Sequence, residues 1–352
     1  MSGNTDAADR CLVLGIETSC DETAAAVVEN GTRVLSNQVH SQVRLHERFR
    51  GVVPEVASRS HMTRILPIVR DALQVAQVEA TDLDAIAVTA RPGMVGSLLV
   101  GLAAAKTLAW SLGKPLIGVD HVQAHVFAAF MAEPDLPLPC LCMVASGGHT
   151  ALYVVREKGR ADCVGRTIDD AAGEALDKGA ALLGLPYPGG PSIESTAQGG
   201  DPRAVDLPRP MLGPESLDFS FSGLKTALLY HLRGPGVTQP MPELDAQQLR
   251  DVAASFQAAV VGTLVRKLRR AAEAMPELRA LAIGGGVARN RLLRQKLADD
   301  RRLARLRIAF PPLDLCSDNG AMIAGLGHHL WRERGQVDDL SLDARATSRS
   351  AR

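Results

Sequence analysis

The chain has 352 residues, of which 46% are hydrophobic and 22% are charged, close to the averages of globular proteins. This composition excludes a disordered chain and a small disulfide-stapled domain, and the length predicts two domains. Lys and Arg total 39 and Asp and Glu total 39, so the formal charge is zero and a wholly basic nucleic-acid coat protein is excluded.

The segments expected in the first half follow the order βββαβαβα. They are strands at 12–16, 24–28 and 33–39, a helix over 56–73 that Pro67 bends, a strand at 85–89, a helix at 97–112, a strand at 116–119 and a helix opening at His121. Three prolines, Pro134, Pro137 and Pro139, then predict a domain boundary, because neither a helix nor a central strand tolerates them at this density.

The second half repeats the opening pattern of strand, turn and strand at 141–144, 146–150 and 152–155. A long periodic helix over 249–268, a strand at 281–283, a Gly284-Gly285-Gly286 turn and another helix follow. Two similar α/β halves predict a ligand cleft between them. Small polar turns such as 146–148 and 284–286 expose backbone N–H groups that suit phosphate oxygens, although each turn taken alone is more often only a turn.

The segment 186–242 holds 10 of the chain's 20 prolines, so it is expected to be a loop-rich insertion. A substrate-binding loop and a disordered surface loop fit this pattern equally well.

Two histidines, His121 and His125, are spaced so that they share one face of a helix and can bind one cation. The best candidate for a third ligand is Asp318, in the turn before the last apolar helix; its alternative role is to cap that helix. Two His and one carboxylate suit Fe(II) or Zn(II). A pair of surface or satisfied histidines is the alternative.

The sequence motifs of several enzyme classes are absent. Val122 stands where an H-E-x-x-H peptidase needs its glutamate, so peptidase chemistry is disfavoured unless a carboxylate such as Asp21 comes from elsewhere. No P-loop or dinucleotide-binding glycine motif occurs.

A basic stretch covers 266–307, with 13 Lys and Arg against four Asp and Glu. This imbalance fits either a surface that follows RNA phosphates or an ordinary solvated helix face.

Several motifs together closely resemble the bacterial branch of the tRNA N6-adenosine threonylcarbamoyltransferase family, TsaD, over about 12–332. The motifs are GIETSCDET, HVQAH, SGGHT, DDAAGEALDK, YPGG, FSFSGLKT, GGGVARN and SDNGAMIA. The resemblance implies an α/β protein with the duplicated actin-like ATPase (RNase H-like) fold shared with sugar kinases and Hsp70. The expected lobes are 11–133 plus 318–332 and 138–316, followed by a flexible tail at 333–352.

The same resemblance implies the site residues. The metal, most often iron and otherwise zinc, would be held by His121, His125 and Asp318, and the catalytic residues Asp21 and Glu22 would border the reacting carbonyl. The substrate adenylate would contact Val144, Ala145, Ser146, Gly147, Gly148, Asp177, Gly190 and Asn290, with Glu194 a weaker candidate. Arg91 and Arg289 depart from the family's pattern.

The implied activity is that of an acyltransferase. It moves the threonylcarbamoyl group of threonylcarbamoyl-AMP to N6 of adenosine 37, beside the anticodon of tRNAs that read codons beginning with A. The implied partners are the tRNA anticodon arm, a paralogous pseudo-enzyme subunit (TsaB-like) and a small P-loop ATPase (TsaE-like). A metal-dependent peptidase and a nucleotide-binding scaffold subunit are the alternatives.

The expected compartment is the cytoplasm, with no membrane partner. The six cysteines form no C-x-x-C pair, and residues 1–10 lack the layout of a secretory signal. The uncharged stretch 92–105 contains glycine and is too short to cross a bilayer.

Overall fold

The computed structural model describes residues 10–348 except 50, 211 and 214. The chain divides into two compact units. Unit 1 comprises Met1–Asp135, Lys158–Arg160 and Pro311–Arg352, and unit 2 comprises Leu136–Glu157 and Ala161–Phe310. The expected second lobe extended to residue 316, whereas residues 311–316 group with unit 1.

Unit 1 is built on a five-stranded mixed sheet of order β3-β2-β1-β4-β5. Its elements are β1 Leu12–Glu17, β2 Glu22–Glu29, β3 Arg33–Ser41, α1 Val43–His46, η1 Glu47–Phe49, α2 Pro54–Ala76, η2 Ala80–Asp82, β4 Ala85–Arg91, α3 Val95–Leu112, β5 Leu116–Asp120, α4 His121–Ala132, α10 Leu313–Cys316 and α11 Gly320–Arg332. β1 pairs antiparallel with β2 and parallel with β4, which pairs parallel with β5. The carboxyl ends of β1, β4 and β5 therefore lie at one edge of the sheet.

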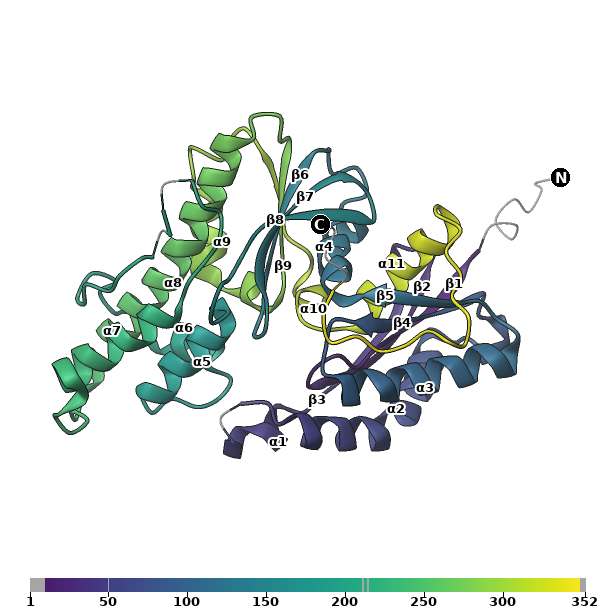
Figure 1. The fold of residues 1–352 in the computed structure, drawn as a ribbon, viewed down its shortest axis with the longest axis horizontal. Helices are drawn as coiled ribbons and strands as arrows, with labels where there is room; N and C mark the ends of the chain where they lie inside the picture. The colour runs from purple at the N-terminus through teal and green to yellow at the C-terminus, as the bar shows by residue number, and fades with distance from the viewer. Residues whose placement is uncertain (1–9, 50, 211, 214, 349–352) are drawn as a thin grey trace. The chain divides into compact units, whose positions relative to one another are not determined.

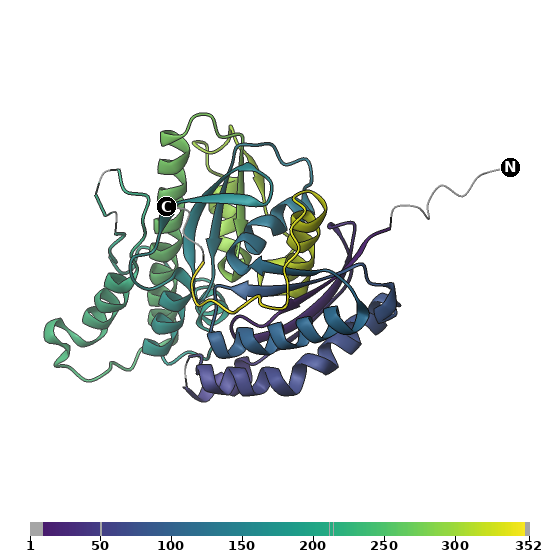
Figure 2. The same ribbon diagram turned by 45° about the vertical axis from the view of Figure 1, so that its right-hand side comes forward.

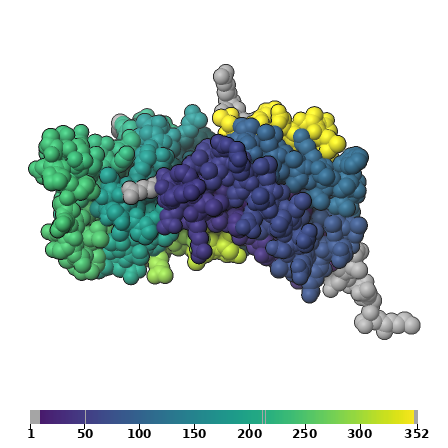
Figure 3. Space-filling model, turned by 90° about the horizontal axis from the view of Figure 1, so that it is seen from below, coloured from purple at the N-terminus to yellow at the C-terminus, as the bar shows by residue number. Residues whose placement is uncertain are grey.

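Helices cover both faces of this sheet, which explains why β1 is buried along its whole length. Helices α2 and α3 pack on one face, and α4 and α11 lie on the other (Figures 1 and 2). Helix α2 begins with Pro54 at its first turn, where a missing N–H costs nothing, and it continues through Pro67. The outer side of α2 lies on the molecular surface (Figure 3).

Helix α3 is the one helix among the described residues that is long and apolar enough to cross a membrane. Leu98, Leu102, Ala105 and Ala109 are nevertheless buried, and three of them belong to the main core cluster of unit 1. Helix α3 is therefore a core helix. Gly113, which has a φ of 64°, ends it in the left-handed conformation typical of a helix terminus.

Unit 2 contains a second five-stranded mixed sheet, of order β10-β9-β6-β7-β8. Its elements are β6 Cys140–Ala145, β7 Thr150–Glu157, β8 Arg160–Arg166, α5 Ala172–Leu182, α6 Gly189–Thr196, α7 Ser222–Arg233, η3 Pro235–Val237, α8 Ala246–Ala274, β9 Ala280–Gly284, η4 Gly286–Arg289, α9 Arg291–Ala298 and β10 Arg307–Ala309. β6 pairs antiparallel with β7 and parallel with β9, and β9 pairs parallel with β10.

The two sheets have the same topology. Strands β6, β7, β8, β9 and β10 occupy the places in the second sheet that β1, β2, β3, β4 and β5 occupy in the first. The predicted duplicated α/β fold is thereby confirmed.

The segment 186–242 is largely irregular but not wholly so. It contains α6 and α7, which the sequence analysis did not predict. Phe221, Leu224 and Leu228 are buried, so the start of α7 packs into the core of unit 2.

The described part of the tail after Arg332, residues 333–348, makes hydrogen bonds to unit 1. The carboxylate of Asp338 accepts a hydrogen bond of 2.8 Å from the N–H of Gly118 in β5, and its own N–H donates to the carbonyl of Leu116. Further along, the N–H of Arg345 donates to the carbonyl of Ala90. This segment therefore adds backbone contacts along β5 and the end of β4, which no periodic pattern in its sequence indicated.

Candidate active site

The histidines of the candidate metal site lie where β5 passes directly into α4. The carboxylate of Asp120 accepts hydrogen bonds from the N–H groups of Val122 and Gln123, at 3.1 and 3.2 Å. This cap starts the helix at His121, so the first and fifth helical residues, His121 and His125, lie one above the other. Both imidazoles are buried.

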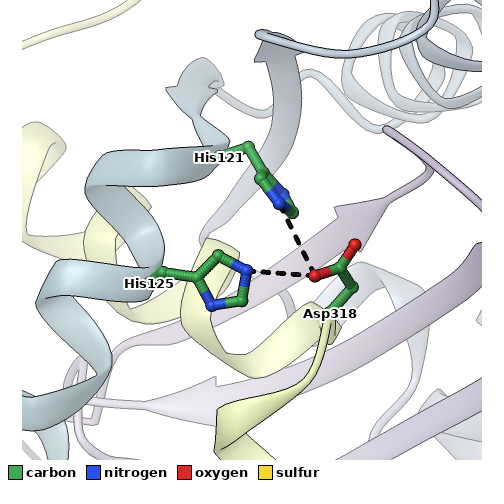
Figure 4. A group of neighbouring side chains, drawn as sticks. All are labelled: His121, His125 and Asp318. Atoms are coloured by element: carbon green, nitrogen blue, oxygen red, sulfur yellow. Dashed lines mark hydrogen bonds and ion pairs between the residues drawn. The ribbon is translucent and has the colours of Figure 1, made fainter. Parts of the chain in front are cut away.

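Asp318 completes this group from the turn before α11. Its Oδ1 lies 3.0 Å from Nε2 of His125 and 3.5 Å from Nε2 of His121 (Figure 4). The three ligand atoms lie within 4.8 Å of one another. The structure therefore brings together the three residues that the sequence analysis selected.

The geometry of this group fits a divalent metal ion. Ligand atoms that surround one ion at about 2.0–2.2 Å are themselves roughly 3–3.5 Å apart in a tetrahedral site, and the Asp318–histidine distances match this spacing. Nδ1 of His125 is buried and has no hydrogen-bond partner among the described residues. Two imidazoles and one carboxylate are a common set for Fe(II) and Zn(II). The group can therefore hold a metal, and the donor set alone does not select which one.

Glu17, which was not predicted from the sequence, orients His121 by a hydrogen bond to its Nδ1. It is the last residue of β1 and is completely buried. Its Oε2 lies 2.8 Å from Nδ1 of His121 and accepts a 2.6 Å hydrogen bond from the hydroxyl of Thr89. The N–H of Ser19 donates to the other oxygen. A carboxylate on Nδ1 keeps a proton there and leaves Nε2 free to bind a metal.

The charges of this group shift its proton affinities. Burial by itself lowers the pKa of His121, but the negative charges of Glu17 and Asp318 outweigh burial and raise the pKa to about 9. Burial by itself would raise the pKa of Glu17, whereas its charge interaction and hydrogen bond with His121 lower it below the ordinary value. The pair is therefore ionised when no metal is bound.

The alternative role considered for Asp318 does not apply. Asn319 caps α11, because its side-chain oxygen accepts a 2.9 Å hydrogen bond from the N–H of Met322. The peptidase-type glutamate position beside His121 holds the buried side chain of Val122.

Asp21 lies in the turn between β1 and β2, and Glu22 is the first residue of β2, in the same unit as the metal group. Asp21 is buried and Glu22 is partly buried. Burial raises the pKa of Glu22 well above its ordinary value, and the nearby charges of Asp21 and Asp318 add to this effect. Glu22 is thus held toward its neutral form in the metal-free protein.

His61 of α2, another residue that was not predicted from the sequence, makes hydrogen bonds to both sides of the turn between β1 and β2. Its Nε2 lies 2.9 Å from the carbonyl oxygen of Cys20, and its Nδ1 lies 2.8 Å from the hydroxyl of Thr23. Burial lowers the pKa of His61, so its neutral ring can donate to the carbonyl and accept from the hydroxyl. In the sequence, His61 is one histidine within a predicted helix, and that position alone does not indicate a functional role.

In unit 2, the turn that follows β6 has an open, glycine-lined surface. Val144 and Ala145 are buried, so they can offer only backbone groups, whereas Gly147 and Gly148 are exposed. An added Cβ at either glycine would meet no atom within 4 Å. The hydroxyl of Ser146 accepts a 3.2 Å hydrogen bond from the N–H of His149, which closes the turn.

The triple-glycine turn follows β9 and lies against the first turn. Gly285 has a φ of 85°, and a Cβ there would lie 2.7 Å from the carbonyl carbon of Ala145, so only glycine fits. Gly286 faces open space. Asn290 is buried and caps α9 by accepting a 3.0 Å hydrogen bond from the N–H of Leu293. The carboxyl ends of two neighbouring parallel strands therefore carry both predicted phosphate-binding turns, as in other α/β nucleotide sites.

The remaining predicted substrate residues are also tied into unit 2. The carboxylate of Asp177 accepts a 2.6 Å hydrogen bond from the N–H of Gly189, which places it beside Gly190. The carboxylate of Glu194 accepts a 2.7 Å hydrogen bond from the N–H of Arg291, at the start of α9. Glu194 is thus already engaged in joining α6 to α9.

The two departures from the family's pattern have different surroundings. Nε of Arg91 lies 3.5 Å from the carboxylate of Asp120, the cap of α4. Arg289 is exposed, in the 3-10 turn that follows the glycines. Neither residue replaces a member of the metal group.

Comparison with known proteins decides the family. The family "TsaD: tRNA N6-adenosine threonylcarbamoyltransferase" matches residues 33–325. The chain belongs to the TsaD family. It is 53% identical to the tRNA N6-adenosine threonylcarbamoyltransferase of Symbiobacterium thermophilum over 334 residues, which cover 95% of both chains. It is 50% identical to that of Geobacillus kaustophilus over 343 residues, which cover 97% of this chain and 98% of the relative.

Solved structures agree with the fold. Component A of (R)-2-hydroxyglutaryl-CoA dehydratase from Acidaminococcus fermentans superposes with a TM-score of 0.52 at 13% identity, covering 93% of this TsaD-family chain and 100% of the other. HypF of T. kodakarensis superposes with a TM-score of 0.56 at 17% identity over 90% of this chain and 47% of HypF. These neighbours support the actin-like ATPase fold alone.

Membership of the TsaD family establishes the class of reaction. The chain is a transferase that modifies tRNA by forming threonylcarbamoyladenosine. The predicted family, fold and activity are therefore confirmed, whereas the individual roles of the site residues stay predictions.

Proposed function

We propose that the chain transfers the threonylcarbamoyl group of threonylcarbamoyl-AMP to N6 of adenosine 37 in tRNAs that read codons beginning with A, releasing AMP. The observation that carries the proposal is the assembly of His121, His125 and Asp318 around one point in a chain of this family. Position 37 lies in a single-stranded loop, where a base can enter a pocket without breaking a duplex.

The chemistry requires a strongly activated donor. The exocyclic amine of adenine is a weak nucleophile, because its lone pair is delocalised into the ring. A carbamoyl-phosphate mixed anhydride compensates for this weakness, because AMP is a good leaving group. The N6–carbonyl bond forms, the bond from the carbonyl carbon to the phosphate oxygen breaks, and one amine proton is lost.

We assign the metal group to charge stabilisation on the donor. A divalent ion, with Fe(II) the first candidate and Zn(II) the second, would supply positive charge that stabilises carbamoyl or phosphate oxygens. His121, His125 and Asp318 would hold it, and Glu17 would keep the ring of His121 oriented by its hydrogen bond at Nδ1.

The turn that follows β6 would bind the adenylate part. Gly147 and Gly148 leave room for a phosphate to approach the backbone, and N–H groups in such a turn stabilise oxyanions. Asp177, Gly190 and Asn290 would contact the nucleoside, and Glu194 is the weaker candidate because its carboxylate already binds the backbone of Arg291.

Asp21 would accept the amine proton or orient the amine, next to the reacting carbonyl. Glu22, whose pKa is raised by burial and by Asp21, is the better candidate for a neutral hydrogen-bond donor. These two neighbouring carboxyl groups would then have different roles because their surroundings differ.

The proposal includes partner proteins and a compartment. We expect a paralogous TsaB-like subunit and a small TsaE-like P-loop ATPase to support turnover, and we expect the tRNA to bind through its anticodon arm. The protein would act in the cytoplasm, where its tRNA substrate is found.

The decisive experiment incubates the metal-loaded chain with threonylcarbamoyl-AMP and unmodified tRNA, with and without the two partner proteins, and measures modified adenosine by nucleoside mass spectrometry. We expect modification by the wild type and none by the double variant His121→Ala and His125→Ala, which should also lose its metal as measured by elemental mass spectrometry. The matched control is His40→Ala with His231→Ala, which removes two histidines outside the metal group. Full modification by the metal-free variant would overturn the role of the metal group, and absence of product in every mixture would overturn the reaction.

A further inference from the structure

The basic stretch 266–307 folds into one side of unit 2. It comprises the end of α8, then β9, α9 and the turn 299–306 that leads into β10. A cavity of about 510 Å³ opens between α8, α9 and this turn. Its charged lining residues are Arg269, Lys296, Asp299, Asp300, Arg301 and Arg302, which we call the α8–α9 groove.

Many cations of this stretch are already used inside unit 2. The guanidinium of Arg305 donates to two carbonyl oxygens, that of Ala272 in the last turn of α8 at 2.6 Å and that of Leu278 after the helix at 2.8 Å. Arg270 donates to the carbonyl of Gly213, and Lys267 donates to that of Ser216. These side chains stabilise the fold and are not available to a ligand.

Three cations of the groove are differently placed. Lys296 and Arg301 are exposed, and the structure gives neither a hydrogen bond nor an ion pair with any described side chain. Arg302 is exposed, and its guanidinium lies 3.6 Å from the equally exposed carboxylate of Glu273. Such a solvent-screened pair is weak, so this guanidinium can turn to a stronger anion.

The charges at the base of the groove are paired with each other. Asp300 is buried, and its Oδ2 lies 2.5 Å from Nε of Arg269. Its other oxygen accepts a 3.0 Å hydrogen bond from the N–H of Arg302, which fixes the start of the turn. Because Asp300 is neutralised by Arg269, the exposed Lys296, Arg301 and Arg302 exceed the exposed carboxylates of Asp299 and Glu273 by one positive charge.

The groove is also close to the predicted nucleotide site within the same unit. Helix α9 starts after Asn290, the predicted nucleoside contact, and Lys296 lies six residues later. At a rise of 1.5 Å per residue, this is about 9 Å along the helix, within the reach of one or two nucleotides. An RNA whose base reaches the donor bound at this site therefore has neighbouring phosphates within range of Lys296, at one end of the groove.

We propose that the α8–α9 groove binds the sugar-phosphate backbone of the substrate tRNA close to the nucleotide that is modified. The proposal rests on the proposed function for the identity of the RNA. Lys296, Arg301 and Arg302 neutralise phosphates and position the loop, whereas they carry no information on sequence. Their contribution to tRNA affinity falls as salt concentration rises, because binding releases counterions.

The test compares the metal-loaded wild type with the triple variant Lys296→Gln, Arg301→Gln and Arg302→Gln in binding to unmodified tRNA, followed by fluorescence anisotropy over a range of salt concentrations. We expect affinity to fall about 10- to 100-fold at physiological salt. The slope of log affinity against log salt should become shallower by about 0.7–0.9 for each phosphate that the variant no longer neutralises. The metal content and the affinity for threonylcarbamoyl-AMP should stay unchanged.

The matched control removes three exposed cations of unit 1, in the variant Arg59→Gln, Arg64→Gln and Arg345→Gln, and should keep the wild-type salt slope. An unchanged affinity and slope in the groove variant would overturn the proposal. So would displacement of the tRNA by millimolar inorganic phosphate at constant ionic strength, since that marks a small-anion site. If the wild type binds tRNA through the groove but forms no modified adenosine, the proposed function fails and the groove stands.

Discussion

Glu17 shows how much a single residue of this protein depends on neighbours far along the chain. In sequence it is a polar residue at the end of an apolar run. In the structure it is completely buried, 104 positions from His121, and the two side chains form an ion pair at 2.8 Å. A buried carboxylate persists because it is paired and accepts further hydrogen bonds from Thr89 and Ser19.

This pair makes the stability of the metal-free protein depend on pH in a defined direction. Folding raises the pKa of His121 from 6.5 to about 9, so the folded chain binds that proton more tightly than the unfolded chain. The resulting stability is complete below about pH 6.5 and is lost as the pH rises through about 9. We expect the melting temperature of chelator-treated protein to fall by a few degrees between about pH 7 and pH 9.5, as measured by scanning fluorimetry.

Glu17→Gln provides the control for this prediction. The amide keeps the size of the side chain but removes the charge that raises the pKa of His121, so the decline with pH should become shallower. An equally steep decline in the variant would assign the effect to other groups. Metal binding requires neutral imidazoles, so the metal-loaded wild type should also show a shallower decline.

At the scale of elements, the position of α11 against β1 and β2 decides where Asp318 lies. Gly15 and Gly320 allow the two backbones to approach closely: a Cβ on Gly320 would lie 2.6 Å from the amide nitrogen of Ala26, and one on Gly15 would lie 2.5 Å from that of Ala324. Both obstacles are backbone atoms, which cannot move aside cheaply. Asp318 is only two residues before Gly320, so the same contact positions the metal ligand.

We therefore expect Gly320→Ala to reduce the free energy of unfolding by about 1–3 kcal/mol, the usual cost of overpacking. The affinity for metal should fall as well, because α11 has to shift and takes Asp318 with it. Urea denaturation and metal titration measure the two effects. Gly223→Ala in α7 is the control, since a Cβ there meets nothing within 4 Å and should be neutral or stabilising by up to about 1 kcal/mol. Equal effects of the two substitutions would refute the packing argument.

At the scale of the whole molecule, the two duplicated sheets carry different functional groups at their equivalent edges. In both sheets the functional side chains follow strands whose carboxyl ends meet at one edge. Unit 1 carries the two histidines of the metal group there, after β5, and Asp21 after β1, and unit 2 carries the two glycine turns, after β6 and β9. Each group is assembled within its own unit.

This separation predicts that the two binding functions can be removed independently. Gly147→Val in unit 2 places a side chain in open space where a phosphate would lie, so we expect affinity for AMP to fall at least about tenfold by the steric exclusion of a hydrogen-bonded ligand. Its metal content should equal that of the wild type. The variant His121→Ala with His125→Ala should show the reverse. Calorimetry and elemental analysis report both quantities, and loss of metal in Gly147→Val would contradict the prediction.

Regular elements were predictable wherever a single pattern dominated. The buried strand β4 and the helix α3 follow from apolar runs and helical spacing, and the repeat of strand, turn and strand predicted the second sheet. Helices α6 and α7 were missed, because the prolines around them hid their short periodicity. The contacts of the segment 333–348 were missed, because they are hydrogen bonds to backbone groups of β5 and β4 that leave no repeating pattern.

By itself, the sequence determined that His121 and His125 share a helix face, because their spacing of four matches the helical repeat. Tertiary structure alone decided that Asp318, 193 positions from His125, brings one oxygen within 3.0 Å of it, and that Glu17 supports His121. The physical reason is that local spacing acts through the geometry of one helix. Distant residues meet only after a sheet, its covering helices and a glycine contact have packed into one core.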